Sequence, residues 1–113
     1  MKKDNIVYIQ DIVEAINKTL SYIDGMGFEE FVEDTLTQDA VLRNFTVVGE
    51  ASGKLSKDFL EEHSAFPIHE AISTRNKVVH DYGDINLDIV WKTAKVDFPV
   101  LLTVCEKILN RSK

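Results

Sequence analysis

Apolar residues recur at intervals of three and four along most of this chain, and this spacing constrains the fold more than any other feature. The interval is that of the α-helix, which has about 3.6 residues per turn. No stretch alternates between apolar and polar residues with the period of two that a half-buried strand shows. We therefore expect an all-α fold, an up-down bundle of about four or five helices.

The first helix should begin behind Asp4, a candidate N-cap, and end at Gly25 and Gly27. Its apolar positions are Ile6, Ile9, Val13, Ile16, Leu20 and Ile23. A short helical turn over residues 28–32 follows, and Thr37 is the expected cap of a third segment. The apolar residues of that segment are Val41, Leu42, Phe45, Val48 and Leu55.

Ser56 should open a further short helix, and Pro67 suits the first turn of a fourth main helix, where its missing N–H costs nothing. Apolar residues expected along one side of that helix are Ile68, Ile72, Val79 and Tyr82. Gly83 should end it. Asn86 is the expected cap of a last helix, which should kink where Pro99 lacks a backbone donor. The apolar residues of this helix are Leu87, Val90, Trp91, Ala94, Phe98, Leu101, Leu102, Cys105, Ile108 and Leu109.

A chain of 113 residues leaves little room for a second hydrophobic core, so we expect a single domain over residues 1–113. The longest uncharged apolar stretch, Phe98 to Cys105, is far shorter than the roughly 20 residues of a membrane span. We expect neither a membrane segment nor a signal peptide. Because the single cysteine cannot form an internal disulfide, a reducing cytoplasm is the expected location.

The net charge of −6 comes from 13 basic and 19 acidic residues, and the pI is near 5.0. This is the opposite of the broad basic surface by which a protein holds nucleic acid through many phosphate contacts. A nuclease with a locally positive cleft is compatible with such a charge. Its affinity for bulk nucleic acid should then be weak and salt-sensitive.

Several residues that resemble other sites have simpler interpretations. The stretch from Gly49 to Ser56 looks like a phosphate-binding loop, but the spacing is one residue short, and Leu55 follows the lysine instead of Ser or Thr. We interpret it as a helix passing into a turn. Cys105 and Trp91 lie on an apolar stripe and are expected in the core. The histidines and the cysteine show no zinc-ligand spacing, so no metal is expected.

Polar side chains gather in Arg75-Asn-Lys-Val-Val-His80-Asp-Tyr82, at the end of the expected fourth helix. Cleavage of a ribose phosphate ester needs a group that exchanges a proton near neutral pH, as His80 can. It also needs a fixed cation for the phosphoryl oxygens, as Arg75 can be. Asn76, four residues before His80 on the same helical face, could orient the imidazole or the phosphate. The alternative is a helix end whose cations favour its dipole, with Tyr82 buried and Arg75 paired to a carboxylate.

Arg75-xxxx-His80-x-Tyr82 matches the RxxxxHxY motif of HepT-like toxins in the HEPN superfamily, and the whole chain resembles that family. The other matching segments are Tyr8-Ile-Gln-Asp-Ile-Val-Glu-Ala-Ile, Phe28-Glu-Glu-Phe, Thr37-Gln-Asp-Ala-Val-Leu-Arg43-Asn44, Gly49-Glu50-Ala51 and Asp88-Ile-Val-Trp91. One departure is Asp81, which is acidic where a small residue is expected. Its charge would favour protonated His80 and repel phosphate.

The resemblance implies an all-α homodimer with its active site in the cleft between subunits, and metal-independent cleavage of RNA. It implies that Arg75 and His80 are the catalytic residues. It also implies a partner, a minimal nucleotidyltransferase antitoxin that adenylylates Tyr82. The chain would then be the toxin of a toxin–antitoxin pair.

In a regular α-helix, Arg75 and His80 would lie about 140° apart with about 7.5 Å of rise between them, so they could not share one face. Either the helix loosens before Gly83, or one subunit supplies Arg75 and the other His80 across a two-fold axis. We favour a contribution from both. Arg43 and Glu50, seven residues apart, face the same way on the third segment. That pair could position Arg75 or accept a proton from His80, although a structural salt bridge is the simpler interpretation.

The predicted function is RNA cleavage in which His80 assists removal of the ribose 2′-hydroxyl proton and Arg75 stabilises a phosphorane-like transition state. DNA lacks that hydroxyl and would not react. Two alternatives stay open. One is a non-enzymatic subunit that holds or presents nucleotide to a nucleotidyltransferase, which the acidic charge would suit. The other is an inert bundle whose polar helix end only stabilises the fold.

Overall fold

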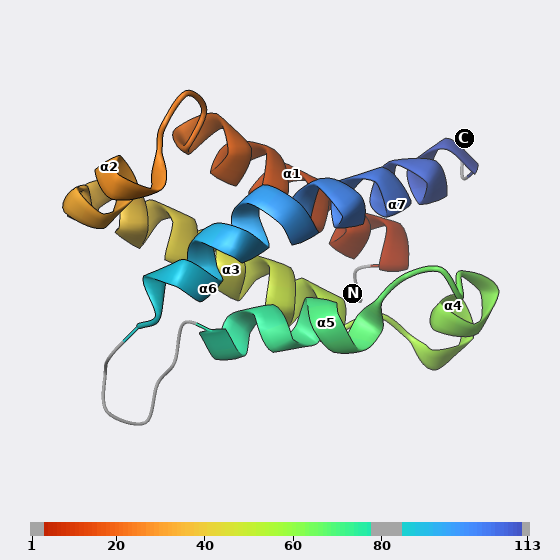
Figure 1. Ribbon diagram of the computed structural model, residues 1–113. Coiled ribbons are helices and arrows are strands. Elements are labelled where there is room, and N and C mark those ends of the chain that lie inside the picture. The colour runs from red at the N-terminus through yellow and green to blue at the C-terminus, as the bar shows by residue number, and fades with distance from the viewer. Residues whose placement is uncertain (1–3, 78–84, 112–113) are drawn as a thin grey trace.

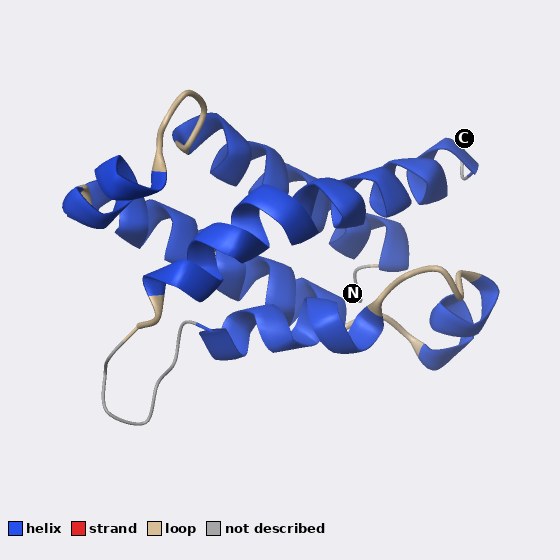
Figure 2. Cartoon of the chain, in the orientation of Figure 1, coloured by secondary structure: helices blue, strands red, loops and turns tan. Residues whose placement is uncertain are grey.

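The computed structural model describes residues 4–77 and 85–111, and the regular structure in these ranges is entirely helical (Figure 2). The elements in chain order are α1 (Asn5–Tyr22), α2 (Phe28–Glu33), α3 (Thr35–Gly53), α4 (Lys57–Glu62), α5 (Ile68–Ser73), the 3-10 helix η1 (Thr74–Lys77), α6 (Leu87–Lys92), the π-helix η2 (Thr93–Asp97) and α7 (Phe98–Arg111). The all-α fold predicted from the apolar spacing is confirmed.

Three of the predicted helix starts are confirmed by their N-cap hydrogen bonds. Asp4 begins α1, Ser56 begins α4 and Asn86 begins α6. Each side-chain oxygen accepts a hydrogen bond from the backbone N–H three residues further on, at 3.0, 3.2 and 3.2 Å respectively. These bonds satisfy donors that have no partner within the helix.

The predicted cap of the third helix was wrong, because the helix begins two residues before Thr37. Asp34 is the N-cap, and its carboxylate accepts hydrogen bonds from the Thr37 backbone N–H at 3.0 Å and from the Thr37 hydroxyl at 2.7 Å. Both residue types can cap a helix, and here the threonine serves as the donor for an aspartate three residues earlier. Leu55, expected on this segment, lies just beyond its end at Gly53 and is buried.

The fourth main helix is shorter than predicted in its described part. Pro67 is the N-cap residue of α5, and α5 ends at Ser73, where the backbone tightens into η1. The Ser73 and Thr74 hydroxyls both donate to the Glu70 carbonyl, at 2.9 and 3.1 Å. Such bonds compete with the backbone ladder of an α-helix. The predicted continuation through Val79 and Tyr82 to Gly83 lies outside the described residues.

The last helix is distorted just before Pro99, where a kink was predicted. α6, η2 and α7 follow one another without a break, and they form the long blue helix of Figure 1. In η2 the turn widens, and the Phe98 N–H bonds to the carbonyl of Thr93, five residues earlier. Pro99 has no N–H of its own, and its ring would collide with the carbonyl four residues before it. The wider π-turn accommodates the proline within a continuous helix.

The core lies among α1, α3 and the α6–α7 helix, with α5 and η1 packed along α3 (Figure 1). Phe45 of α3 and Phe98 of α7 are both fully or almost fully buried, with ring centroids 4.9 Å apart. Trp91, expected in the core, is only half-buried and packs its ring against that of Phe31 at 5.2 Å. Within the described ranges, no helix is long and apolar enough to cross a membrane.

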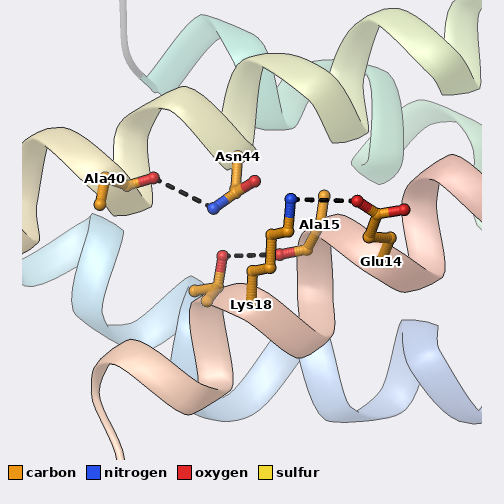
Figure 3. Close-up of polar contacts among 6 residues, drawn as sticks. Glu14, Ala15, Lys18, Ala40 and Asn44 are labelled. Carbon is orange, nitrogen blue, oxygen red and sulfur yellow. Dashed lines mark hydrogen bonds and ion pairs between the residues drawn. The ribbon is translucent and has the colours of Figure 1, made fainter.

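Polar side chains border the contact between α1 and α3, and those of Glu14 and Lys18 are exposed at the surface (Figure 3). Lys18 forms an ion pair with Glu14 one turn earlier on α1, at 3.0 Å. The Asn44 side chain, 7% exposed, donates to the carbonyl of Ala40 on α3 at 3.1 Å. Each of the contacts drawn in Figure 3 lies within one helix.

The Asp34 cap generates a prediction about acid stability. The hydrogen bonds from the Thr37 hydroxyl and N–H lower the pKa of the Asp34 carboxyl below its usual 3.8. A group whose pKa is lowered by folding contributes stability above its unfolded pKa, and this is lost as the pH falls through the folded pKa. We expect Asp34→Ala to lower the melting temperature at neutral pH, and the gap from wild type to narrow below pH 3.8. Thermal melts from neutral pH to below pH 3.8 measure this difference in melting temperature, with Asp39→Ala on the same helix as control. A gap that stays constant with pH would contradict this account.

Candidate active site

Two of the predicted site residues, Arg75 and Asn76, fall on η1, and the other residues of the motif come later in the chain. Arg75 and Asn76 are both exposed on this 3-10 turn. His80, Asp81 and Tyr82 lie outside the described residues. The site can therefore be built from the arginine end of the motif and from the helices that hold it.

Arg75 lies directly against α3. A Cβ atom built on Gly49 would stand 2.6 Å from the Arg75 Cβ and 2.9 Å from the Arg75 backbone nitrogen. One turn further along α3, a Cβ built on Gly53 would stand 3.9 Å from Nη1 of the Arg75 guanidinium. The side chain therefore runs along α3 from Gly49 toward the C-terminal end of the helix, with the guanidinium beside Gly53.

The backbone around Arg75 is held by its neighbours on α5 and η1. Thr74 is 3% exposed, and its hydroxyl donates to the Glu70 carbonyl. Ala71, one turn earlier, is also buried. One side of the α5–η1 segment is thus packed in the core. Arg75, the next residue after Thr74, projects along the surface from a fixed backbone.

The guanidinium of Arg75 has no opposite charge beside it in the part of the chain that the structure describes. No described carboxylate lies within 4.0 Å of it, and no described residue hydrogen-bonds to it. The alternative in which Arg75 is paired to a carboxylate is therefore not supported within these ranges. The last turn of α3 exposes carbonyl groups whose partial negative charge favours a nearby cation. That interaction is weak enough to leave the guanidinium available to an anion.

The 3-10 turn changes the geometric argument about Arg75 and His80. The angle of about 140° between them was calculated for a regular α-helix, which has about 3.6 residues per turn, whereas a 3-10 helix has about 3.0. The helix departs from α geometry at Thr74, earlier than the expected loosening before Gly83, and it tightens there instead of loosening. Whether His80 comes from the same subunit or from a partner stays a prediction, since His80 lies outside the described ranges.

Asn76 lines a shallow hollow of about 320 Å³. This hollow does not include the face of α3 along which the Arg75 side chain runs, from Gly49 to Gly53, which we call the Arg75 track. The other residues of this hollow are Ser73, Lys77, Asn86 and Ile89. It therefore connects η1 to the beginning of α6. The predicted role of Asn76 in orienting the imidazole or the phosphate stays a prediction.

Arg43 and Glu50 are not placed on the Arg75 track. Arg43 lines a hollow of about 200 Å³ between α1 and α3, together with Asp11, Glu14, Ala15, Lys18, Asn44 and Val47. On an ideal helix Arg43 lies about 120° around α3 from Gly49. Glu50 is exposed, about 100° from Gly49. Neither forms an ion pair with another described residue, so the simpler salt-bridge interpretation is not supported there.

The interpretations of Cys105 and of the Gly49–Ser56 stretch are confirmed. Cys105 is fully buried, and burial, followed by the nearby Glu106 carboxylate, raises the pKa of its thiol to about 12. A thiol with such a pKa is not a nucleophile near neutral pH. Gly49 lies inside α3, which ends at Gly53, so the stretch that looks like a phosphate loop is a helix end.

The sequence interpretation missed the role of the two glycines on α3. Gly49 and Gly53 are four residues apart, which places them on one face of the helix and leaves a shallow track without side chains. Their spacing was the available signal, because glycine weakens a helix interior unless close packing requires it. Nothing in the sequence, however, indicated that Arg75 would occupy the track.

Comparison with known proteins gives consistent matches over almost the whole chain. The family model described as "Ribonuclease HepT-like" matches residues 12–108. A protein named "Probable ribonuclease HepT" from Thermococcus cleftensis is 36% identical over 108 residues, which cover 96% of this chain and 98% of that protein. Proteins named "Putative RNase" are similar as well. One from Caldanaerobacter subterraneus is 32% identical over 94% of this chain and 95% of its own length. One from Methanocaldococcus jannaschii is 36% identical over 96% of this chain and 90% of its own length. No solved structure matches significantly.

Proposed function

The chain belongs to the HepT-like ribonuclease family, and on that premise we propose that it is an RNA endonuclease in which Arg75 and His80 carry the reaction. The placement of Arg75 supports this assignment most directly. Its backbone is held against α3, and its exposed guanidinium has no carboxylate partner among the described residues. A fixed guanidinium can donate two parallel hydrogen bonds to a phosphoryl group, as the transition state of phosphate cleavage requires.

In the proposed reaction, the ribose 2′-oxygen attacks the adjacent phosphorus while His80 takes the hydroxyl proton. Arg75 donates hydrogen bonds to the non-bridging oxygens as negative charge builds up in a phosphorane-like transition state. The bond between phosphorus and the 5′-oxygen then breaks, and this oxygen takes up a proton from water. The products are a cyclic phosphate and a 5′-hydroxyl. DNA is not a substrate, because it lacks the attacking hydroxyl.

This reaction would take place in a cleft between two copies of the chain. Beside η1, the α6–α7 helix exposes Ile89, Val96 and Val100, which are 44%, 54% and 63% accessible. A groove of about 240 Å³ runs between this helix and η1, and its lining includes Lys77 and Val100. Exposed apolar side chains next to the motif form a surface that a second copy could cover, and a two-fold axis there would bring two motifs together.

The chain would be the toxin of a toxin–antitoxin pair, silenced by a minimal nucleotidyltransferase that adenylylates Tyr82. Tyr82 stands two residues after His80 in the motif. A nucleotide attached to its hydroxyl would fill the cleft and would bring a phosphate to Arg75 in place of RNA. Charge-assisted pairing of that phosphate with the guanidinium would remove the cation that the transition state needs.

The catalytic assignment predicts that Arg75→Ala and His80→Ala abolish RNA cleavage and growth inhibition. Both should keep a melting temperature within a few degrees of wild type, roughly the shift produced by ~1 kcal/mol in a domain of this size. His69→Ala removes an exposed histidine of α5 outside the motif and should cleave normally. Cleavage by either motif variant at the wild-type rate would refute the assignment. If wild type binds nucleotide but does not cleave RNA, the non-enzymatic subunit is favoured. If both variants lose helicity, a structural role for these residues is favoured.

The shared cleft predicts a dimer whose loss removes activity. Wild type should sediment at twice the chain mass, and Val100→Glu should yield monomers that cleave RNA poorly, because a buried unpaired carboxylate is costly. Leu36→Glu is the control, since Leu36 is 81% exposed at the opposite end of α3 from η1. A wild type that stays monomeric at micromolar concentration would exclude the shared cleft.

The proposed regulation predicts that Tyr82→Phe remains toxic but escapes inhibition by the cognate nucleotidyltransferase and ATP. Phenylalanine fills nearly the same volume but offers no hydroxyl for the adenylyl group. Intact mass and RNA cleavage before and after incubation measure both effects. The regulation is refuted if wild type gains no adenylyl mass, or gains it on another residue, even where the nuclease assignment holds.

A further inference from the structure

Gly49 stands in the buried face of α3, where its conformation gives no reason for a glycine. Among the described glycines, only Gly25 has a positive φ, so Gly49 has the backbone of an ordinary helical residue. Glycine weakens a helix interior relative to alanine, because its backbone loses more freedom on folding. The presence of glycine at this position therefore calls for a steric reason.

Arg75 provides that reason. A Cβ on Gly49 would meet the Arg75 Cβ at 2.6 Å, the Arg75 backbone nitrogen at 2.9 Å and the Arg75 Cγ at 3.0 Å. The first two separations are shorter than real Cβ contacts, and the atoms involved cannot rotate away as the tip of a flexible side chain can. Any side chain at residue 49 would have to push η1 away from α3.

We propose that Gly49 is a positioning residue for Arg75, because its lack of a side chain lets η1 touch α3 and lets the arginine lie along the track to Gly53. This inference rests on the proposed role of Arg75 in RNA cleavage. A long arginine side chain that lies along a helix samples fewer rotamers than one that extends into water. The guanidinium is thereby oriented before RNA arrives.

Gly53 borders the same track but does not hold Arg75 in place. A Cβ at residue 53 would meet Nη1 at 3.9 Å, an ordinary van der Waals contact with the mobile end of the side chain. Gly49→Ala and Gly53→Ala are therefore matched variants. They make the same chemical change on the same helix, and only the first displaces the backbone that carries Arg75.

The first experiment compares RNA cleavage by these two variants. A misplacement of about 1 Å in a positioned catalytic group can cost about 10²-fold in rate. We expect Gly49→Ala to lower kcat about 10²-fold with little change in KM, and Gly53→Ala to stay within a few-fold of wild type. Equal effects of the two substitutions would overturn the inference, as would full activity of Gly49→Ala.

A second comparison separates positioning from general loss of stability. Arg75→Lys is measured with Gly49 and with Gly49→Ala, and the ratio of arginine to lysine activity is taken in each background. If Gly49 orients the guanidinium, that ratio should fall sharply in the alanine background. A displaced arginine loses its two parallel hydrogen bonds to the phosphoryl group, whereas lysine cannot form such a pair in either background. A ratio that stays the same would mean that Gly49→Ala acts only through the fold.

An activity-free readout distinguishes failure of this inference from failure of the proposed function. The Nε–H order parameter of Arg75, measured by nitrogen-15 relaxation, should be high in wild type and in Gly53→Ala, and should fall in Gly49→Ala. If wild type does not cleave RNA, the proposed function fails and this measurement alone decides the positioning role. Equal order parameters in the three proteins would overturn it.

Gly49→Ala could also prevent folding, and a compensating variant covers that case. In Gly49→Ala/Arg75→Gly the shortest contact disappears, because residue 75 then has no Cβ. We expect the double variant to have a higher melting temperature than Gly49→Ala, once the change caused by Arg75→Gly alone is subtracted. A double variant no more stable than this would show that contact with the Arg75 side chain is not the reason for glycine at residue 49.

Discussion

The contact of η1 with α3 is closer than a side chain at residue 49 would permit, and the candidate site depends on it. α3 is in contact with α1, α2, α5 and η1, so a segment that touches α3 is fixed to the centre of the fold (Figure 1). Thr74 is buried on one side of this contact and Arg75 is exposed on the other. The arginine therefore combines a core-like backbone with a guanidinium in solvent. A group that must meet a charged substrate without reorganising needs both properties.

Features of the fold that depend on one residue and its near neighbours could be predicted from the sequence. Features that depend on which of two possible hydrogen bonds forms could not. Asp4 and Asn86 cap helices because an N-cap needs only a side-chain oxygen near the N–H three residues on. Asp34 and Thr37 are both capping types within one turn, and only the structure shows that the carboxylate is the acceptor. The end of α5 depended similarly on whether the Thr74 hydroxyl bonds to a backbone carbonyl or leaves the α-helical ladder intact.

For the candidate site, the motif identified Arg75 but not its surroundings. Its helix, its exposure and its chemistry follow from residues near it in sequence, whereas its contact with Gly49 joins distant segments. The glycine spacing on α3 was visible, but it resembled a phosphate loop and its partner could not be inferred. Arg43 shows the opposite case. Its spacing predicted a face shared with Glu50 that could position Arg75, whereas Arg43 lines a hollow on the α1 side and not the arginine track.

The acidic charge of the chain and a phosphate-binding arginine are compatible because the two act over different distances. At physiological salt the Debye length is about 8 Å, so carboxylates further than this from Arg75 are largely screened. Because the molecule measures 41 × 31 × 25 Å, much of its surface lies further than this from Arg75, and no described carboxylate forms an ion pair with the guanidinium. The net charge of −6 therefore weakens attraction of RNA from a distance more than it weakens binding at contact. Binding should then depend on a few well-placed contacts, and the orientation of Arg75 on α3 matters more than it would on a broadly basic surface.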